Sequence, residues 1–191
     1  TNEYRMTHYY SPKPLKLPSR KNSRSLLNKL QHTLEDSVRI RLISDVPVGT
    51  FCSGGLDSSL ITAIAARESP SIKAFTVSHS DVPVHDELPY AKDVCKHLNI
   101  PLVKLSMTKE KFRDALVSTI YHAGSPLTQI NTVSLRLLSK LIRESGIKVM
   151  LSGEGADELF GGYVYQYRKE AVKYLSTNLP FPANSISNLI L

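Results

Sequence analysis

The sequence has little cysteine and no long apolar run, and both absences narrow its class. Its two cysteines, Cys52 and Cys95, are too few for a disulfide scaffold or a tetrahedral metal site. We expect both to be reduced thiols in a cytosolic protein. No apolar stretch approaches the roughly 20 residues that a membrane helix needs, and the first ten residues lack the apolar core of a signal peptide. The sequence therefore predicts a cytoplasmic protein that does not enter a membrane.

Negative charge is scarce at one end of the chain only. The 191 residues carry a net charge of +7, and residues 1–41 hold nine Lys or Arg against three Asp or Glu. A basic chain is a candidate for nucleic-acid binding. Here, however, the excess belongs to an N-terminal stretch whose residues 11–25 are rich in proline and read as a linker. We therefore do not expect nucleic acid to be the partner.

Short strands alternate with helices over most of the chain. The 41% hydrophobic content and the length suit one globular domain. We expect a helix from about Ser25 that Pro47 ends, because leucines recur there at spacings of three and four. Further strands are expected at 48–52, 71–78, 101–105 and 147–152, with helices at 57–67, 87–98, 109–123 and 133–145. This alternation predicts an α/β fold, a three-layer sandwich with a parallel sheet, in which ligands bind beyond the carboxyl ends of the strands.

The segment SGGLDSS, residues 53–59, lies between a predicted strand and a predicted helix. Its two glycines allow a tight turn whose N–H groups approach an anion, and its serines add hydroxyl donors for phosphate oxygens. Asp57 would repel bare phosphate, so its presence implies a divalent cation, for which Mg²⁺ is the natural choice. The segment lacks the Gly-Lys-Ser/Thr of a Walker A loop. The alternative is an ordinary turn in which Asp57 is a helix N-cap.

A second glycine-rich segment, VMLSGEGADELFGGY at 149–163, carries three acids within five residues: Glu154, Asp157 and Glu158. Carboxylates packed this closely repel one another unless a cation or a proton compensates. The alternative is a solvated acidic loop whose last two acids favour the start of a helix. A phosphate-binding loop and an acidic loop at two strand ends are together typical of a Mg-ATP site.

Both segments carry a family resemblance. SGGLDSS resembles the pyrophosphate-binding loop of the N-type ATP pyrophosphatases, and VMLSGEGADELFGGY resembles the signature of the synthetase domain of asparagine synthetases. The resemblance covers roughly residues 25–175 and includes the FTVS strand and the HDELPYAKDV stretch. It implies a fold of the adenine nucleotide alpha-hydrolase-like (HUP) type, with ATP and Mg²⁺ as cofactors.

The resemblance also implies a role for each matching residue. The pyrophosphate end of ATP would be held by the loop residues Ser53, Gly54, Gly55, Asp57, Ser58 and Ser59. The adenosine pocket would be lined by Cys52, Val77, Ser152 and Gly153. Mg²⁺ would be bound by Asp57 and Asp157. Glu154 would be the catalytic acid that handles the proton of the attacking amine, and Tyr163 would pack rather than react.

The reaction that this resemblance implies is ATP-driven amide formation. A carboxylate, aspartate by first expectation, is adenylated with release of pyrophosphate, and ammonia then converts the adenylate to asparagine and AMP. The implied partners are small substrates and a glutaminase domain or subunit that supplies ammonia, with a homo-oligomer as a further option. Two alternatives stay open. One is a related amidotransferase or beta-lactam synthetase-like cyclase acting on another carboxylate, and the other is an incomplete ATP-binding module.

The expected layout has three parts: a basic tail at 1–24, the ATP pyrophosphatase domain at 25–175, and the start of a C-terminal region at 176–191. Enzymes of the family usually begin with a glutaminase domain whose N-terminal Cys is the nucleophile. This sequence begins with Thr, and neither cysteine is placed for that role. We therefore expect the sequence to be part of a longer enzyme.

Overall fold

The structure is a computed structural model that describes residues 5–11, 23–79, 81 and 86–163. The chain divides into two compact units, Thr1–Ser37 and Val38–Leu191. Most of the predicted tail and all of the predicted region 176–191 lie outside the described residues, so those domain boundaries stay predictions. Among the described residues, no helix combines the length and the hydropathy needed to cross a bilayer.

Helix α1, Ser23–Arg41, begins in the first unit and ends in the second. The apolar period had predicted a longer helix, reaching toward Pro47, and this prediction was wrong at its C-terminal end. The residue before a proline avoids the helical region of backbone space, and the Val46 N–H bonds instead to the Ser44 hydroxyl at 3.2 Å. Leu27 is 64% exposed, so its part of the apolar face is not covered.

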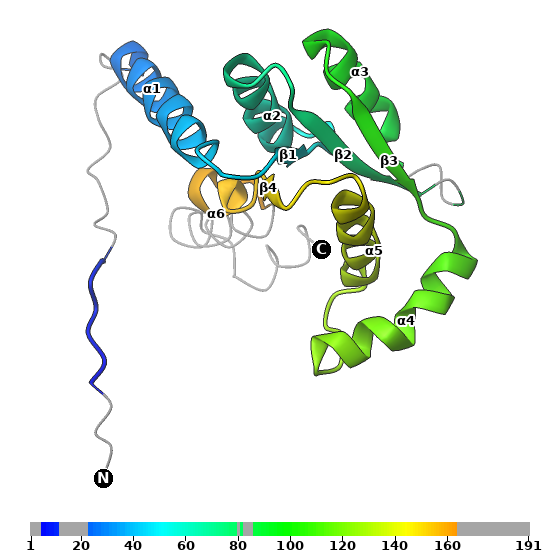
Figure 1. Ribbon diagram of the computed structural model, residues 1–191. Coiled ribbons are helices and arrows are strands. Elements are labelled where there is room, and N and C mark those ends of the chain that lie inside the picture. Colours follow the sequence, from blue (N-terminus) through cyan, green and yellow to red (C-terminus); the bar gives the residue numbers. More distant parts are fainter. Residues whose placement is uncertain (1–4, 12–22, 80, 82–85, 164–191) are drawn as a thin grey trace, which may run out of the picture. The chain divides into compact units, whose positions relative to one another are not determined.

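The second unit holds a parallel sheet of four strands in the order β3-β2-β1-β4 (Figure 1). The strands are β1 Val48–Phe51, β2 Lys73–Ser78, β3 Leu102–Ser106 and β4 Val149–Leu151. The helices are α2 Leu56–Glu68, α3 Leu88–Leu98, α4 Lys109–Ala123, α5 Asn131–Glu144 and the short α6 Ala156–Phe160. Thr50 at the centre of β1 pairs with Ala74 on one side and Leu151 on the other. The predicted strands and helices are all present with small shifts at their ends, and α6 is an addition.

Helices cover both faces of this sheet. Successive strand residues point to opposite faces, so Ala74 packs with α3 whereas its neighbour Phe75 packs with α5. Phe75 is fully buried and lies in a cluster with Leu138, Ile142 and Ile147. Figure 1 shows α2 and α3 on one side of the sheet and α5 on the other. The α/β fold and the three-layer sandwich with a parallel sheet are therefore confirmed.

Helix ends in this unit follow local chemistry. The Thr108 side chain accepts a bond from the Lys111 N–H at 3.3 Å and so caps α4. Gly124 ends α4 in the left-handed conformation, and Asn99 ends α3 in the same way.

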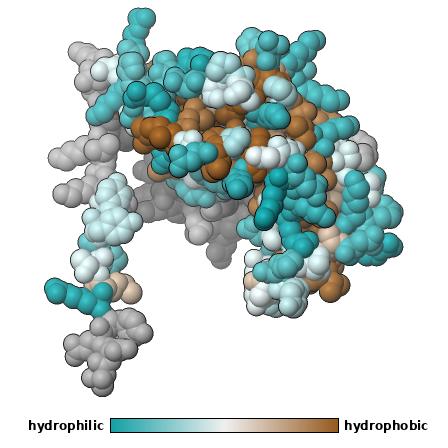
Figure 2. Space-filling view, in the orientation of Figure 1, coloured by the Kyte–Doolittle hydropathy of each residue, from teal (hydrophilic) through white to brown (hydrophobic). Residues whose placement is uncertain are grey.

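Figure 2 shows hydrophobic surface among hydrophilic side chains, and the exposed large apolar residues of this unit include Ile43, Leu56, Val117, Tyr121 and Leu159. The helices therefore keep some apolar side chains on their outer faces.

The strand order creates a natural place for a ligand. From β1 the chain continues through α2 to β2 on one side, and it later returns through α5 to β4 on the other side of β1. The strand order therefore changes direction at β1, which has β2 on one side and β4 on the other. In open parallel sheets, ligands bind in the crevice at such a switch point.

Candidate functional site

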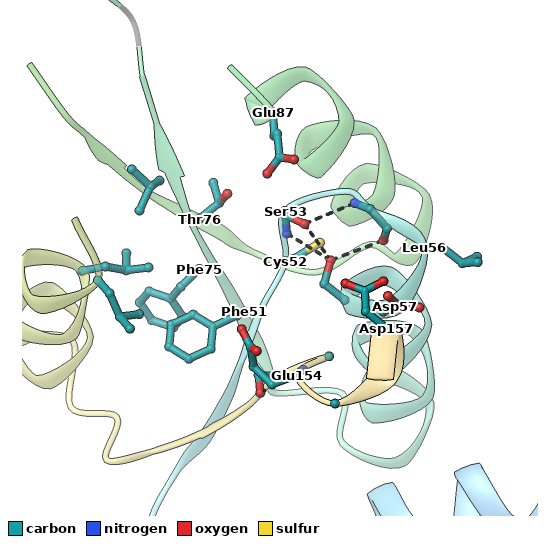
Figure 3. Close-up of a pocket in the computed structure, with 18 of the residues that line it drawn as sticks. Phe51, Cys52, Ser53, Leu56, Asp57, Phe75, Thr76, Glu87, Glu154 and Asp157 are labelled. Carbon is teal, nitrogen blue, oxygen red and sulfur yellow. Dashed lines mark hydrogen bonds between the residues drawn. The ribbon is translucent and has the colours of Figure 1, made fainter. Parts of the chain in front are cut away.

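A cavity of about 510 Å³ lies at this switch point (Figure 3). Its walls come from the β1–α2 loop, the end of β2, helix α5 and the β4–α6 loop. Most of the residues predicted for the site line it: Cys52, Ser53, Gly55, Asp57, Ser58, Val77, Ser152, Gly153, Glu154 and Asp157. Two segments nearly 100 residues apart in the sequence therefore meet around one cavity.

The β1–α2 loop leaves the sheet at Cys52, whose N–H still bonds to the Phe75 carbonyl at 2.9 Å. Gly54 then takes a φ of +88°, which glycine adopts readily. A Cβ at this position would lie 2.6 Å from the Ala91 nitrogen and would also collide with the Tyr90 side chain. Gly54 is therefore required by a close approach to α3, and it does not line the cavity.

Serine side chains hold this loop in shape. The Ser53 N–H donates to the Ser58 hydroxyl at 3.2 Å, and the two hydroxyl oxygens are 3.0 Å apart. The Ser58 hydroxyl also donates to the Gly55 carbonyl at 3.3 Å, and the Gly55 N–H donates to the Ser53 hydroxyl at 3.3 Å. Figure 3 draws these bonds as a closed ring at the start of α2. Ser59, which was predicted to hold phosphate, does not line the cavity.

The start of α2 differs from the ordinary-turn alternative. Gly55 is the N-cap and makes no side-chain capping bond, whereas Asp57 lies in the first turn of the helix. Asp57 is therefore not the N-cap, and this part of the alternative was wrong. Without a capping side chain, N–H groups at the positive end of the helix dipole stay available for an anionic ligand.

The β4–α6 loop approaches the first loop closely. A Cβ on Gly153 would lie 2.9 Å from the Ser58 nitrogen and 3.0 Å from the Asp57 Cβ. Gly155 is the N-cap of α6 with a φ of +91°, and a side chain on Gly162 would collide with the Asp157 carboxylate. The glycines of the acidic segment therefore permit the contact between the loops and the packing around Asp157.

The acids of the cavity come from both loops. Asp57 lies in α2 and Asp157 in α6, and their side chains lie close to each other in Figure 3, whereas Glu154 of the β4–α6 loop lies apart from them. No cluster of three or more His, Cys, Asp or Glu side chains able to hold a metal occurs within the described ranges. Mg²⁺ at nucleotide sites, however, is commonly held by one or two carboxylates together with substrate phosphates. The pair Asp57 and Asp157 fits that pattern.

Several residues at the cavity were not predicted from the sequence. They are Phe51, Leu56, Phe75, Thr76, His79, Leu135, Leu138 and Gly155. Glu87, Tyr163 and Glu158, the third acid of the predicted acidic loop, also line the cavity. Glu87 occupies the N-cap of α3 and also lines the cavity. Tyr163, expected to pack, donates from its hydroxyl to Glu158 at 3.3 Å. Thr76 directly precedes the predicted Val77 in β2, whereas nothing local pointed to the α5 leucines.

Asp86 organises the edge of the site beside Glu87. Its carboxylate accepts bonds from the Ser78 hydroxyl at 3.0 Å, the Leu88 N–H at 3.2 Å and the His79 N–H at 3.3 Å. Desolvation acts to raise the pKa of Asp86, but these hydrogen bonds and the nearby His79 together lower it. An ionised Asp86 therefore ties the end of β2 to the start of α3.

Comparison with known proteins points in one direction. The family model described as "Asparagine synthase" matches residues 29–188. "Asparagine synthetase B [glutamine-hydrolyzing]" of Escherichia coli (strain K12) is 38% identical over 164 residues, which covers 78% of this chain and 29% of that protein. A "Probable asparagine synthetase [glutamine-hydrolyzing]" of Schizosaccharomyces pombe is 42% identical over 154 residues, covering 71% of this chain and 28% of that protein. The chain thus spans less than a third of the length of these curated relatives.

A solved structure gives an independent comparison of the fold. The glutamine-dependent NAD+ synthetase from Acinetobacter baumannii, in complex with adenosine diphosphate, matches with a TM-score of 0.53 and 17% identity. The match covers 91% of this chain and 36% of that one. At this identity the likeness shows a shared fold, in agreement with the predicted α/β class.

Proposed function

Because the chain belongs to the asparagine synthase family, we propose that it contains the ATP-dependent, amide-forming site of a larger ligase. The site adenylates the side-chain carboxylate of aspartate, releases pyrophosphate, and then transfers ammonia to give asparagine and AMP. The observation that carries the proposal is the meeting of the two loops, with the Gly153 backbone against Asp57 and Ser58 over one cavity.

The β1–α2 loop and the start of α2 hold the pyrophosphate end of ATP in this proposal. N–H groups at an uncapped helix start attract phosphate, and the Ser53 and Ser58 hydroxyls can turn from each other toward phosphate oxygens. Gly54 and Ser59 support the loop from outside the cavity. Donors fixed in this way stabilise the charge that develops on the leaving pyrophosphate.

The adenosine end of ATP lies toward the strand ends. Cys52 follows β1 and Val77 lies in β2 just before its last residue, whereas Ser152 and Gly153 follow β4 on the other side of β1. Apolar side chains from α5, Leu135 and Leu138, line the same cavity. Backbone groups with an apolar wall are suited to a flat, uncharged base.

Asp57 and Asp157 would hold Mg²⁺, which supplies positive charge to the phosphate oxygens when it is bound. Glu154 lies at the same cavity, and its carboxylate takes the proton that ammonia loses when nitrogen attacks the activated carbonyl. Ammonia comes from a glutaminase domain or subunit, because the curated relatives named above are glutamine-hydrolysing.

The test uses the full-length protein and three variants. Asp57→Asn should weaken Mg-ATP binding at least tenfold in equilibrium dialysis, while Asp93→Asn on the exposed side of α3 should leave it unchanged. Glu154→Gln should retain aspartate-dependent pyrophosphate exchange but slow asparagine formation by about 10²–10⁴-fold. Equal ATP affinity in Asp57→Asn and Asp93→Asn would refute the site. Pyrophosphate release with another carboxylate but not with aspartate would refute the acceptor.

A further inference from the structure

Two buried thiols meet beneath the β1–α2 loop. Cys52, directly after β1, is 1% exposed, and Cys95 in α3 is 2% exposed. They share one core cluster with Ala74 and Ala91, whose small side chains leave the sulfurs room to meet. Both cysteines are free, and the interaction of the two side chains is the first cause of the shift in the pKa of each. The pair is therefore positioned for a bond that the chain has not formed.

Two hydroxyl groups complete the surroundings of Cys52. The buried Ser59 and Thr62 hydroxyl oxygens have no hydrogen-bond partner within the described part of the chain, and both residues act to lower the pKa of the Cys52 thiol. A buried hydroxyl without a partner is destabilising, because it has lost its hydrogen bonds to water. A thiolate at Cys52 would accept from both hydroxyls and so remove this cost.

The two thiols have pKa values shifted in opposite directions. The hydrogen bond from Cys95 lowers the pKa of Cys52; desolvation opposes this, and donation from Gly54, Thr62 and Ser59 adds to it. The same hydrogen bond, together with desolvation, raises the pKa of Cys95. Cys52 is therefore the nucleophile of the pair, and Cys95 stays a thiol until it is attacked or attacks.

Access to Cys52 comes from the nucleotide cavity, because Cys52 belongs to its lining whereas Cys95 does not. We propose that Cys52 and Cys95 are a reversible oxidation site, which hydrogen peroxide entering this cavity converts to a disulfide that weakens nucleotide binding. The Cys52 thiolate attacks one peroxide oxygen, the O–O bond breaks, and a sulfenic acid and water form after proton uptake. The Cys95 sulfur then attacks the Cys52 sulfur and displaces a second water. Two thiols and one peroxide thus give one disulfide and two waters, and a dithiol reverses the step.

The consequence for binding follows from bond length. Bonded sulfurs lie about 2.05 Å apart, which is shorter than any hydrogen bond between two sulfurs, so oxidation draws the end of β1 toward α3. Gly54 already lies against Tyr90 and Ala91 of α3, so the loop has no free space on that side. The loop must then change the path that places Ser53 at the cavity. This part of the inference rests on the proposed function.

The experiment treats the full-length protein with hydrogen peroxide, with and without saturating Mg-ATP, and then maps its peptides. The expected result is a Cys52–Cys95 peptide with the mass loss of two hydrogens, slowed by Mg-ATP and reversed by dithiothreitol. Nucleotide affinity should fall at least tenfold with the disulfide. Cys95→Ala should bind ATP normally when reduced, and its oxidised Cys52 should react with the sulfenic-acid reagent dimedone. Cys95→Ser serves if the alanine variant is unstable.

Each outcome decides the inference. No linked peptide in the folded protein would refute the oxidation site. A linked peptide with unchanged ATP affinity would refute the effect on binding, as would an equal loss of affinity in peroxide-treated Cys95→Ala. If the reduced protein binds no ATP at all, the proposed function fails, and peptide mapping alone still decides whether the two thiols pair.

Discussion

Replacement of Gly54 by alanine should lower the stability of the fold more than any other glycine-to-alanine change in the β1–α2 loop. The residue has a φ of +88°, a region that costs a residue with a Cβ roughly 1–2 kcal/mol. The added carbon would also lie 2.6 Å from the Ala91 nitrogen, which is backbone and cannot rotate away. Overpacking of this kind costs about 1–3 kcal/mol. We therefore expect a loss of about 2–5 kcal/mol out of a total stability on the order of 5–15 kcal/mol.

Two other glycines serve to separate the cost of backbone strain from the cost of the steric overlap with α3. Gly124→Ala introduces a φ of +67° with open space around the new carbon, so it reports backbone strain alone, about 1 kcal/mol. Gly55→Ala has a φ of −69° and a nearest atom at 3.4 Å, so we expect a change within about 0.5 kcal/mol. The difference between Gly54→Ala and Gly124→Ala is the cost of the contact with α3.

Urea unfolding followed by circular dichroism measures these differences at constant slope, so that a change in midpoint is a change in stability. A Gly54→Ala variant no less stable than Gly124→Ala would refute the reasoning, because the loop would then not rest against Tyr90 and Ala91. If Gly54→Ala fails to fold, it is still less stable than Gly124→Ala, and the soluble yields of the two variants are then compared.

Two further predictions concern hydrogen bonds at the edges of the cavity. Ser58→Ala removes the acceptor of the Ser53 N–H, and it should lower the free energy of unfolding in urea by about 1–3 kcal/mol. Ser139→Ala, at an exposed position of α5, should change it by almost nothing. Equal losses in the two variants would contradict the bonded ring. Because the folded-state pKa of Asp86 is lowered, its stabilisation is present above the ordinary value of about 3.9 and is lost as pH falls through the lower folded-state pKa. Asp86→Asn should therefore differ most from the parent near pH 7 and converge with it below about pH 4 in urea titrations. A difference that stays constant from pH 7 to pH 3 would contradict this.

Local sequence was enough to predict what depends on neighbours along the chain. The alternation of apolar runs with turn residues located the strands and helices, and the two glycine-rich segments placed Ser53 and Glu154 at one cavity. The end of α1 was missed because its apolar period continues to Leu42, while Pro47 acts on the residue before it. The period of α5 was visible, yet its packing over the strand ends, which brings Leu135 to the cavity, depends on contacts far apart in sequence.

The same distance in sequence explains two assignments within the loop itself. The SGGLDSS pattern suggested that all of its residues face phosphate, but Gly54 and Ser59 do not line the cavity. A bound phosphate and a packed helix can both require a residue without a side chain. Only the position of Tyr90, more than 30 residues later in the chain, distinguishes them.

The pairing of β1 with β4 makes the site a late product of protein synthesis. Val48 pairs with Val149, so about 100 residues must leave the ribosome before the acidic loop can reach the first loop. Contacts between residues this distant carry a large loop-closure entropy and form slowly. The β1–β2 pairing can form earlier, since it joins Gly49 to Lys73. A nascent chain therefore acquires its nucleotide cavity only when the whole sheet is assembled, and ATP added during refolding should bind with the kinetics of that last strand.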